Sequence, residues 1–161
     1  MSDTLATSDG AGAASSGAVL VGNQFVKDLS FEAPGGPLGL GSLKEMPEIS
    51  LDVDVGATAL QEGVFEVTLA MKAEARAQER TLFLVELAYA GVFSIGEMPK
   101  EMVEPFLFVE APRLLFPFAR QIIATVTRDG GFPPLMLQPI DFPELYRRKR
   151  TRNETQEPAS A

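Results

Sequence analysis

The sequence of 161 residues contains no His, no Cys and no Trp. Without Cys, disulfide bonds and thiol chemistry are excluded. Without His and Cys together, the usual nucleophile–base pairs and most transition-metal sites cannot be assembled. Because His is also the commonest general acid–base, the composition argues against an enzyme. A catalytic pair of carboxylates such as Asp52 and Asp54 is the remaining rival, but an open sheet offers no cleft to shift their pKa values.

Long apolar runs are missing as well. No stretch approaches the roughly 18 apolar residues of a membrane span, so no stable membrane insertion is expected. Residues 1–22 contain no Lys or Arg, and their longest apolar run is Ala18–Val21. This segment therefore lacks the parts of a secretory signal peptide. Together with the absence of Cys, this predicts a cytoplasmic protein.

The charge is unevenly distributed. The formal net charge is −8, yet five of the 14 basic residues lie in residues 147–152, which leaves nine against 22 acidic residues elsewhere. So acidic a body repels phosphates, which predicts no nucleic-acid partner and favours a basic protein partner. The basic run is typical of a solvated helix end, where cations suit the dipole. Its alternative role is contact with acidic protein segments or anionic lipid.

The two ends differ in composition from the middle of the chain. Residues 1–22 are mostly Ala, Gly, Ser and Thr, and residues 151–161 are polar and contain Pro158. Neither segment has enough apolar side chains to offset the entropy of ordering it. The sequence therefore predicts disordered tails at 1–22 and 151–161, flanking one folded domain at 23–150.

Alternation of apolar and polar residues predicts four strands. They are expected at Gln24–Ala33, Glu48–Val55, Val64–Ala73 and Arg80–Ala90. In the first strand, Phe25, Leu29 and Phe31 are expected on one face, with Val26, Asp28, Ser30 and Glu32 on the other. A short turn near Ala77–Gln78 predicts an antiparallel hairpin between the last two strands.

After the fourth strand the pattern changes to that of helices. Pro99 and Pro105 predict a loop with short helical turns over Gly96–Val109. A long helix is expected from Pro112 to Gly130, with Leu115, Phe118, Ile122 and Val126 at helical spacing. Asp141 is expected to cap a last helix. The predicted fold is α+β: a four-stranded antiparallel sheet with a long helix and a short C-terminal helix on one face.

The second face of this sheet is predicted to be open and acidic. An antiparallel sheet can leave one face in water, and most of the charged strand residues alternate onto that face. Its acidic members are expected to be Asp28, Glu32, Glu48, Asp52, Asp54, Glu66 and Glu86, with Lys72 the main positive charge.

Five short segments occur in the order found in one known family. They are Lys27–Pro34 (KDLSFEAP), Gly91–Ile95 (GVFSI), Leu115–Arg120 (LFPFAR), Gly131–Leu135 (GFPPL) and Pro139–Phe142 (PIDF). In these segments the chain resembles SecB, the export chaperone that carries precursor proteins to the motor ATPase SecA. Each segment alone is a weak signal, whereas five in order are specific.

The resemblance implies a homotetramer built as a dimer of dimers, without a cofactor, that keeps unfolded precursor proteins competent for export. It also implies docking on SecA through Asp28, Glu32, Leu84 and Glu86. The plain alternative for these acids is a solvated sheet face, although an exposed Leu84 among acids suits an anchor in a docking surface. The alternative function is that of a SecB-like chaperone dedicated to a single client, such as an antitoxin.

A groove for unfolded clients is expected between residues 96–110 and the last helix. Its candidate residues are Met98, Met102, Phe106, Phe108, Phe142 and Tyr146, because adaptable apolar surfaces suit promiscuous binding. The alternative is that these side chains form the core and the subunit interface. The loop before the second strand carries Lys44-Glu45-Met46 where the family commonly has a Trp, and Pro99 and Pro105 stiffen a segment expected to flex.

Overall fold

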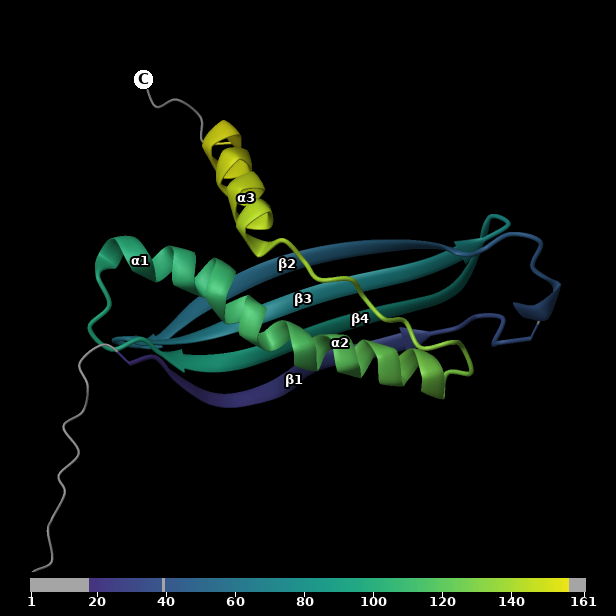
Figure 1. Ribbon diagram of the computed structural model, residues 1–161, viewed down its shortest axis with the longest axis horizontal. Helices are drawn as coiled ribbons and strands as arrows, with labels where there is room; N and C mark the ends of the chain where they lie inside the picture. The colour runs from purple at the N-terminus through teal and green to yellow at the C-terminus, as the bar shows by residue number, and fades with distance from the viewer. Residues whose placement is uncertain (1–17, 39, 157–161) are drawn as a thin grey trace, which may run out of the picture.

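The computed structural model describes residues 18–38 and 40–156. Four strands form one antiparallel sheet in the order β1-β4-β3-β2 (Figure 1). They are β1 (Leu20–Glu32), β2 (Glu48–Gln61), β3 (Val64–Ala77) and β4 (Arg80–Ser94). The strands are longer than predicted, but their number, their antiparallel arrangement and the hairpin between β3 and β4 are as predicted.

Four helical segments accompany α2 (Ala111–Asp129), the long helix of the chain. They are η1 (Leu40–Ser42), α1 (Lys100–Pro105), η2 (Phe106–Glu110) and α3 (Phe142–Gln156). The predicted short helical turns in Gly96–Val109 are present as α1 and η2, but they are continuous with each other and with α2, and the loop expected around them is confined to the residues before α1. Pro99 directly precedes α1, where a missing N–H costs nothing. Consequently α1, η2 and α2 follow one another without a break.

The ends of the folded domain lie farther out than predicted. Strand β1 begins at Leu20, inside the segment expected to be a tail, and α3 continues to Gln156. The rest of the two predicted tails, residues 1–17 and 157–161, lies outside the described residues.

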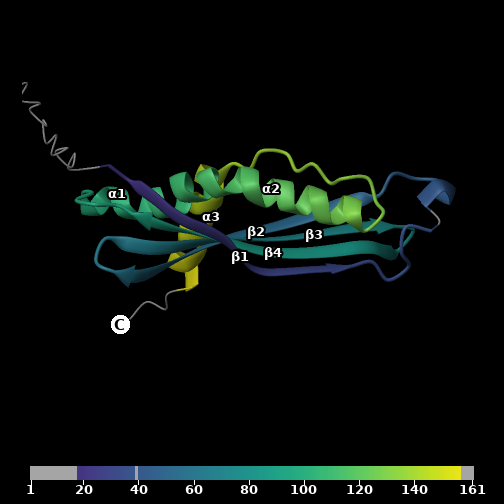
Figure 2. The ribbon, with the colours of Figure 1, turned by 90° about the horizontal axis from the view of Figure 1, so that it is seen from below.

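One face of the sheet is covered by α2 (Figure 2), and we call it the inner face. Leu115, Ala119 and Ile123 of α2 are fully buried there. Phe118 was expected to belong to the same apolar series, but its side chain is 51% exposed because the buried side of the helix passes through Ala119 instead. The opposite face, which we call the outer face, carries no helix over its centre (Figure 2).

A bulge in β1 corrects the predicted faces of that strand. The pairing of β1 with β4 shifts between Val26 and Asp28, so Lys27 has no direct partner. An extra residue reverses the alternation on one side of it. Phe25 therefore lies opposite Ala90 on the outer face, whereas Val26 lies opposite Tyr89 on the inner face. The prediction was wrong for these two residues.

One hairpin turn and one buried hydroxyl complete the frame. Gln78 and Glu79 both have positive φ angles, 52° and 62°, as a two-residue hairpin turn requires. The Thr127 hydroxyl donates to the Ile123 carbonyl at 2.9 Å and accepts from the Leu135 amide at 2.9 Å. It therefore fastens the connection between α2 and α3 to the helix.

Gly91 provides a test of the contact between α2 and the sheet. A Cβ atom at this position would lie 2.8 Å from Leu115 Cδ2 and 3.1 Å from a ring carbon of Phe93. We expect Gly91→Ala to lower the free energy of unfolding by about 1–3 kcal/mol, because the core around it cannot accept the extra atom.

Gly56→Ala is the matched control, since a Cβ there meets no atom within 4 Å. Urea unfolding followed by circular dichroism measures both variants. Equal stability of the two variants would contradict the close packing of α2 on the sheet.

Candidate functional site

The register of β1 and β4 brings four predicted residues together on the outer face. Asp28 lies opposite Ala88, and Glu32 lies opposite Leu84, while Glu86 lies opposite Ser30. Side chains that face one another in a ladder share a face of the sheet. Asp28, Glu32, Leu84 and Glu86 therefore form one surface, which we call the docking face.

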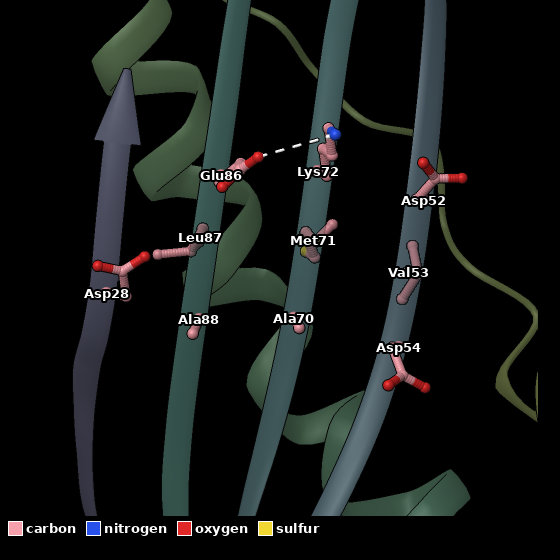
Figure 3. Close-up of a pocket in the computed structure, with 10 residues that line it drawn as sticks. All are labelled: Asp28, Asp52, Val53, Asp54, Ala70, Met71, Lys72, Glu86, Leu87 and Ala88. Carbon is pink, nitrogen blue, oxygen red and sulfur yellow. Dashed lines mark ion pairs between the residues drawn. The ribbon is translucent and has the colours of Figure 1, made fainter. Parts of the chain in front are cut away.

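A shallow hollow of about 310 Å³ lies beside these residues (Figure 3). Ala70 and Ala88 occupy its middle, where their small side chains leave space. Carboxylates surround the hollow from three strands: Asp28, Asp52, Asp54 and Glu86. The Lys72 ammonium lies 3.8 Å from Glu86. The hollow therefore attracts groups of positive charge.

Among the described residues, the outer face carries Lys27 and Arg76 as well as Lys72. The prediction that Lys72 is its main positive charge was therefore wrong. Each cation is already paired with an acid: Lys27 with Glu66, Lys72 with Glu86, and Arg76 with Glu74. In the part of the chain that the structure describes, no ion pair involves Asp28, Glu32 or Asp52. The outer face consequently keeps its acidic character.

Glu74 has a displaced pKa. The Thr81 hydroxyl donates a hydrogen bond of 2.8 Å to its carboxylate, and Arg76 donates another of 3.0 Å. These bonds hold the pKa of Glu74 below its usual range. Glu74 therefore stays ionised to lower pH than a free Glu side chain.

Phe108 and Tyr146, two of the predicted client residues, lie together. Their rings stack with centroids 5.9 Å apart, and the Tyr146 hydroxyl donates to Glu104 at 2.9 Å. Burial raises the pKa of Tyr146, and the hydrogen bond to Glu104 raises it further. Tyr146 is thus a neutral donor that joins α3 to α1.

Phe108 and Tyr146 line a groove of about 570 Å³ between β2 and α3. One wall carries apolar residues of β2 such as Leu51 and Val53, and the other carries Leu145 with Arg148 and Lys149. In Figure 2, α3 passes the β2 edge of the sheet, from the level of α2 to the opposite side. We call this space the mixed groove.

The other predicted client residues lie elsewhere. The Phe142 side chain is only 2% exposed and packs edge-on against Phe116, so it belongs to the core. Phe106 packs edge-on against Phe93. Neither Phe106 nor Met98 nor Met102 lines the mixed groove.

A second groove, also of about 570 Å³, was not predicted. It lies between the segment before β2 and the connection from α2 to α3, and we call it the apolar groove. Its walls include Leu40, Leu43, Met46, Phe132 and Leu135. The sequence signal for this apolar wall is the spacing of Leu40, Leu43 and Met46, which recur every third residue.

Among the described residues, no helix is both long enough and apolar enough to cross a membrane. The described surfaces comprise the acidic hollow on the outer face, the mixed groove at the β2 edge and the apolar groove beside the connection to α3.

Comparisons with known proteins identify relatives of this chain. The family described as "Preprotein translocase subunit SecB" matches residues 13–153. A protein-export protein SecB of Afipia carboxidovorans is 48% identical over 99% of this chain and 98% of its own length. That of Bradyrhizobium diazoefficiens is 53% identical over 80% of each chain.

A solved structure shares the fold at much lower identity. It is a SecB-like chaperone of Mycobacterium tuberculosis, in complex with a peptide from the HigA1 antitoxin. It matches with a TM-score of 0.64 and 14% identity, covering 76% of this chain and 90% of its own. The family match, the close relatives and the shared architecture together show that this chain belongs to the SecB family.

Proposed function

We propose that this chain is a protein-export chaperone that holds non-native precursor proteins and delivers them to SecA in the cytoplasm. The observation that carries the proposal is the separation of two kinds of surface on one subunit. The outer face is acidic and open. The apolar groove is lined largely by apolar side chains, and the mixed groove is lined by apolar and basic side chains together. An acidic surface suits a basic partner, and apolar grooves suit unfolded segments.

General export is favoured over a role restricted to one client. The relatives that are 48–53% identical carry the name protein-export protein SecB. The antitoxin-bound neighbour is 14% identical, so it supports the fold and leaves the choice of client open. The apolar groove is open and contains flexible side chains such as Met46. Such a surface can adapt to client segments of many different sequences.

The docking face is proposed to bind SecA. Asp28 and Glu32 supply carboxylates that form no ion pair among the described residues. Leu84 supplies an apolar side chain between charged neighbours. Charges on such a surface steer a basic partner, while the central apolar group excludes water. The proposed contact therefore has the layout of a small interface with a charged rim.

A homotetramer, arranged as a dimer of dimers, is proposed for the assembled protein. Apolar side chains are exposed on edge strand β1 and on α2. They are Leu20, Val21, Phe25, Val26 and Leu29 on β1, and Leu114 and Phe118 on α2. An exposed apolar patch of this kind indicates a protein interface, and a symmetric assembly buries it.

Two neighbouring residues of β4 separate docking from assembly. The Glu86 side chain faces the outer hollow and is 45% exposed, so Glu86→Lys should change stability by less than about 0.5 kcal/mol. It should weaken binding to SecA about tenfold by reversing one charge of the docking face. Val85 is fully buried, so Val85→Asp should cost about 3–5 kcal/mol and disrupt the tetramer.

Analytical ultracentrifugation measures the assembly, and isothermal titration calorimetry measures SecA affinity. Wild type and Glu86→Lys should both sediment as tetramers. A stable wild-type monomer at micromolar concentration would refute the tetramer. Unchanged SecA affinity in Glu86→Lys, combined with an unchanged salt dependence, would refute the docking face.

Met46 tests the apolar groove as a client site. Its side chain lines the groove and is 90% exposed, so Met46→Ser should leave folding intact. Loss of this apolar contact should weaken binding of a denatured precursor by roughly fivefold, which corresponds to about 1 kcal/mol.

Leu38→Ser is the matched control, because Leu38 is 91% exposed in the same connection but lies outside the apolar groove. Affinity for a fluorescently labelled, urea-denatured precursor gives the readout. Equal affinities of the two variants would place client binding elsewhere.

A further inference from the structure

We propose that Asp54 couples the docking face to α3. A basic partner bound on the outer face draws Asp54 away from Lys149, and the C-terminal half of α3 then leaves the edge of β2. This inference rests on the proposed function, and it adds a route by which SecA binding weakens the hold on a client. Its structural basis is a bridge between Lys149 of α3 and residues 54 and 55 of β2.

Lys149 makes three contacts beyond its own helix. Its ammonium lies 3.3 Å from Asp54 Oδ1, donates to the Val55 carbonyl at 2.6 Å, and lies 5.0 Å from the centre of the Phe108 ring. Its side chain is 38% exposed, whereas that of Arg147 is 70% exposed. Arg147 and Arg148 instead pair with Glu144 inside α3. Within the described residues, Lys149 is thus the member of the basic run that forms an ion pair and a hydrogen bond with the sheet.

Asp54 lies where two surfaces meet. It lines the acidic hollow of the outer face and also the mixed groove beneath α3. Its neighbour across the strand pair is Ala70, a residue of the outer face, and Figure 3 shows its carboxylate beside the hollow. A cation bound in the hollow therefore comes within reach of the same carboxylate that Lys149 uses.

The Lys149 bridge is the last ion pair or hydrogen bond between α3 and the sheet in the described residues. Phe142 is buried at the start of the helix, and Tyr146 is bonded to Glu104 one turn later. Residues 150–156 are exposed, and the ion pairs and hydrogen bonds of this described segment reach no strand. Loss of the bridge would therefore free the C-terminal half of α3 while its beginning stays anchored.

Release of α3 has a defined consequence for the mixed groove. One wall of that groove is α3 itself, and its freed C-terminal half supplies Lys149, Arg152 and Asn153. When this half moves away, a client segment held in the groove loses these contacts. Docking of SecA would in this way favour transfer of the client to SecA, because the two events compete for one carboxylate.

A purely structural role for Lys149 is the alternative. Strand β2 is an edge of the sheet, and a Lys beside an edge strand protects it from pairing with other chains. In that case Lys149 would stay in place when SecA binds, and Asp54 would matter only for local packing.

Limited trypsin digestion of the full-length protein distinguishes the two roles, because residues 147–152 contain five cleavage sites. Cleavage follows the population of the opened helix. Asp54→Asn removes the charge that Lys149 contacts, so cleavage at 147–152 should become about fivefold faster. Asp52 lines the same hollow and the same groove as Asp54, but it forms no ion pair among the described residues. Asp52→Asn is therefore the matched control, and it should be cleaved at the wild-type rate. Client affinity should fall severalfold in Asp54→Asn alone.

The same digestion is then repeated with SecA present, with binding measured by calorimetry on the same samples and peptides of this chain read by mass spectrometry. SecA should raise the wild-type cleavage rate towards that of Asp54→Asn and leave the rate of Asp54→Asn unchanged.

Equal cleavage rates for Asp54→Asn and Asp52→Asn in the absence of SecA would overturn the bridge. SecA that binds without raising wild-type cleavage would overturn the coupling and leave the docking face standing, whereas SecA that does not bind would overturn both.

Discussion

The burial of the inner sheet face under α2 fixes the positions of the other surfaces. Leu115, Ala119 and Ile123 seal against β3 and β4, and the alternation of the strands then turns every second side chain to the outer face. That face cannot be covered by the same helix, so it remains in water and carries charge. The connection fastened by Thr127 and the helix α3 then run beside this core, and the two grooves form along them.

The division into two kinds of surface gives a physical account of how one chaperone chain can bind partners of different chemistry. Clients and a motor protein make different demands, because unfolded segments offer apolar side chains and a docking partner offers fixed charge. In this chain the apolar groove lies on the inner side of the sheet, the acidic hollow lies on the outer face, and the mixed groove lies between them at the β2 edge. Asp54 lies at the border between the hollow and the mixed groove, so communication between them needs no large rearrangement of the core.

Sequence patterns predicted the sheet well and the helical edge of the molecule less well. Alternation in β2, β3 and β4 identified the inner side correctly because one face of each strand is buried. It failed at Phe25 and Val26 because a bulge at Lys27 leaves no mark in the pattern of apolar residues. The helical phase around Phe118 was ambiguous since α2 is apolar on two sides. The apolar groove and the contact of Lys149 with Asp54 join segments far apart in the chain, and such pairs cannot be read from local spacing.

The central claim is that client and motor protein occupy different surfaces of one subunit at the same time. Sedimentation velocity with a fluorescent denatured precursor, this protein and SecA measures it directly, because the three species differ in size. The account predicts that the labelled precursor sediments in a ternary complex, with a lower affinity for this protein than when SecA is absent. Strict competition, in which SecA displaces every bound precursor without a ternary complex at any concentration, would contradict it.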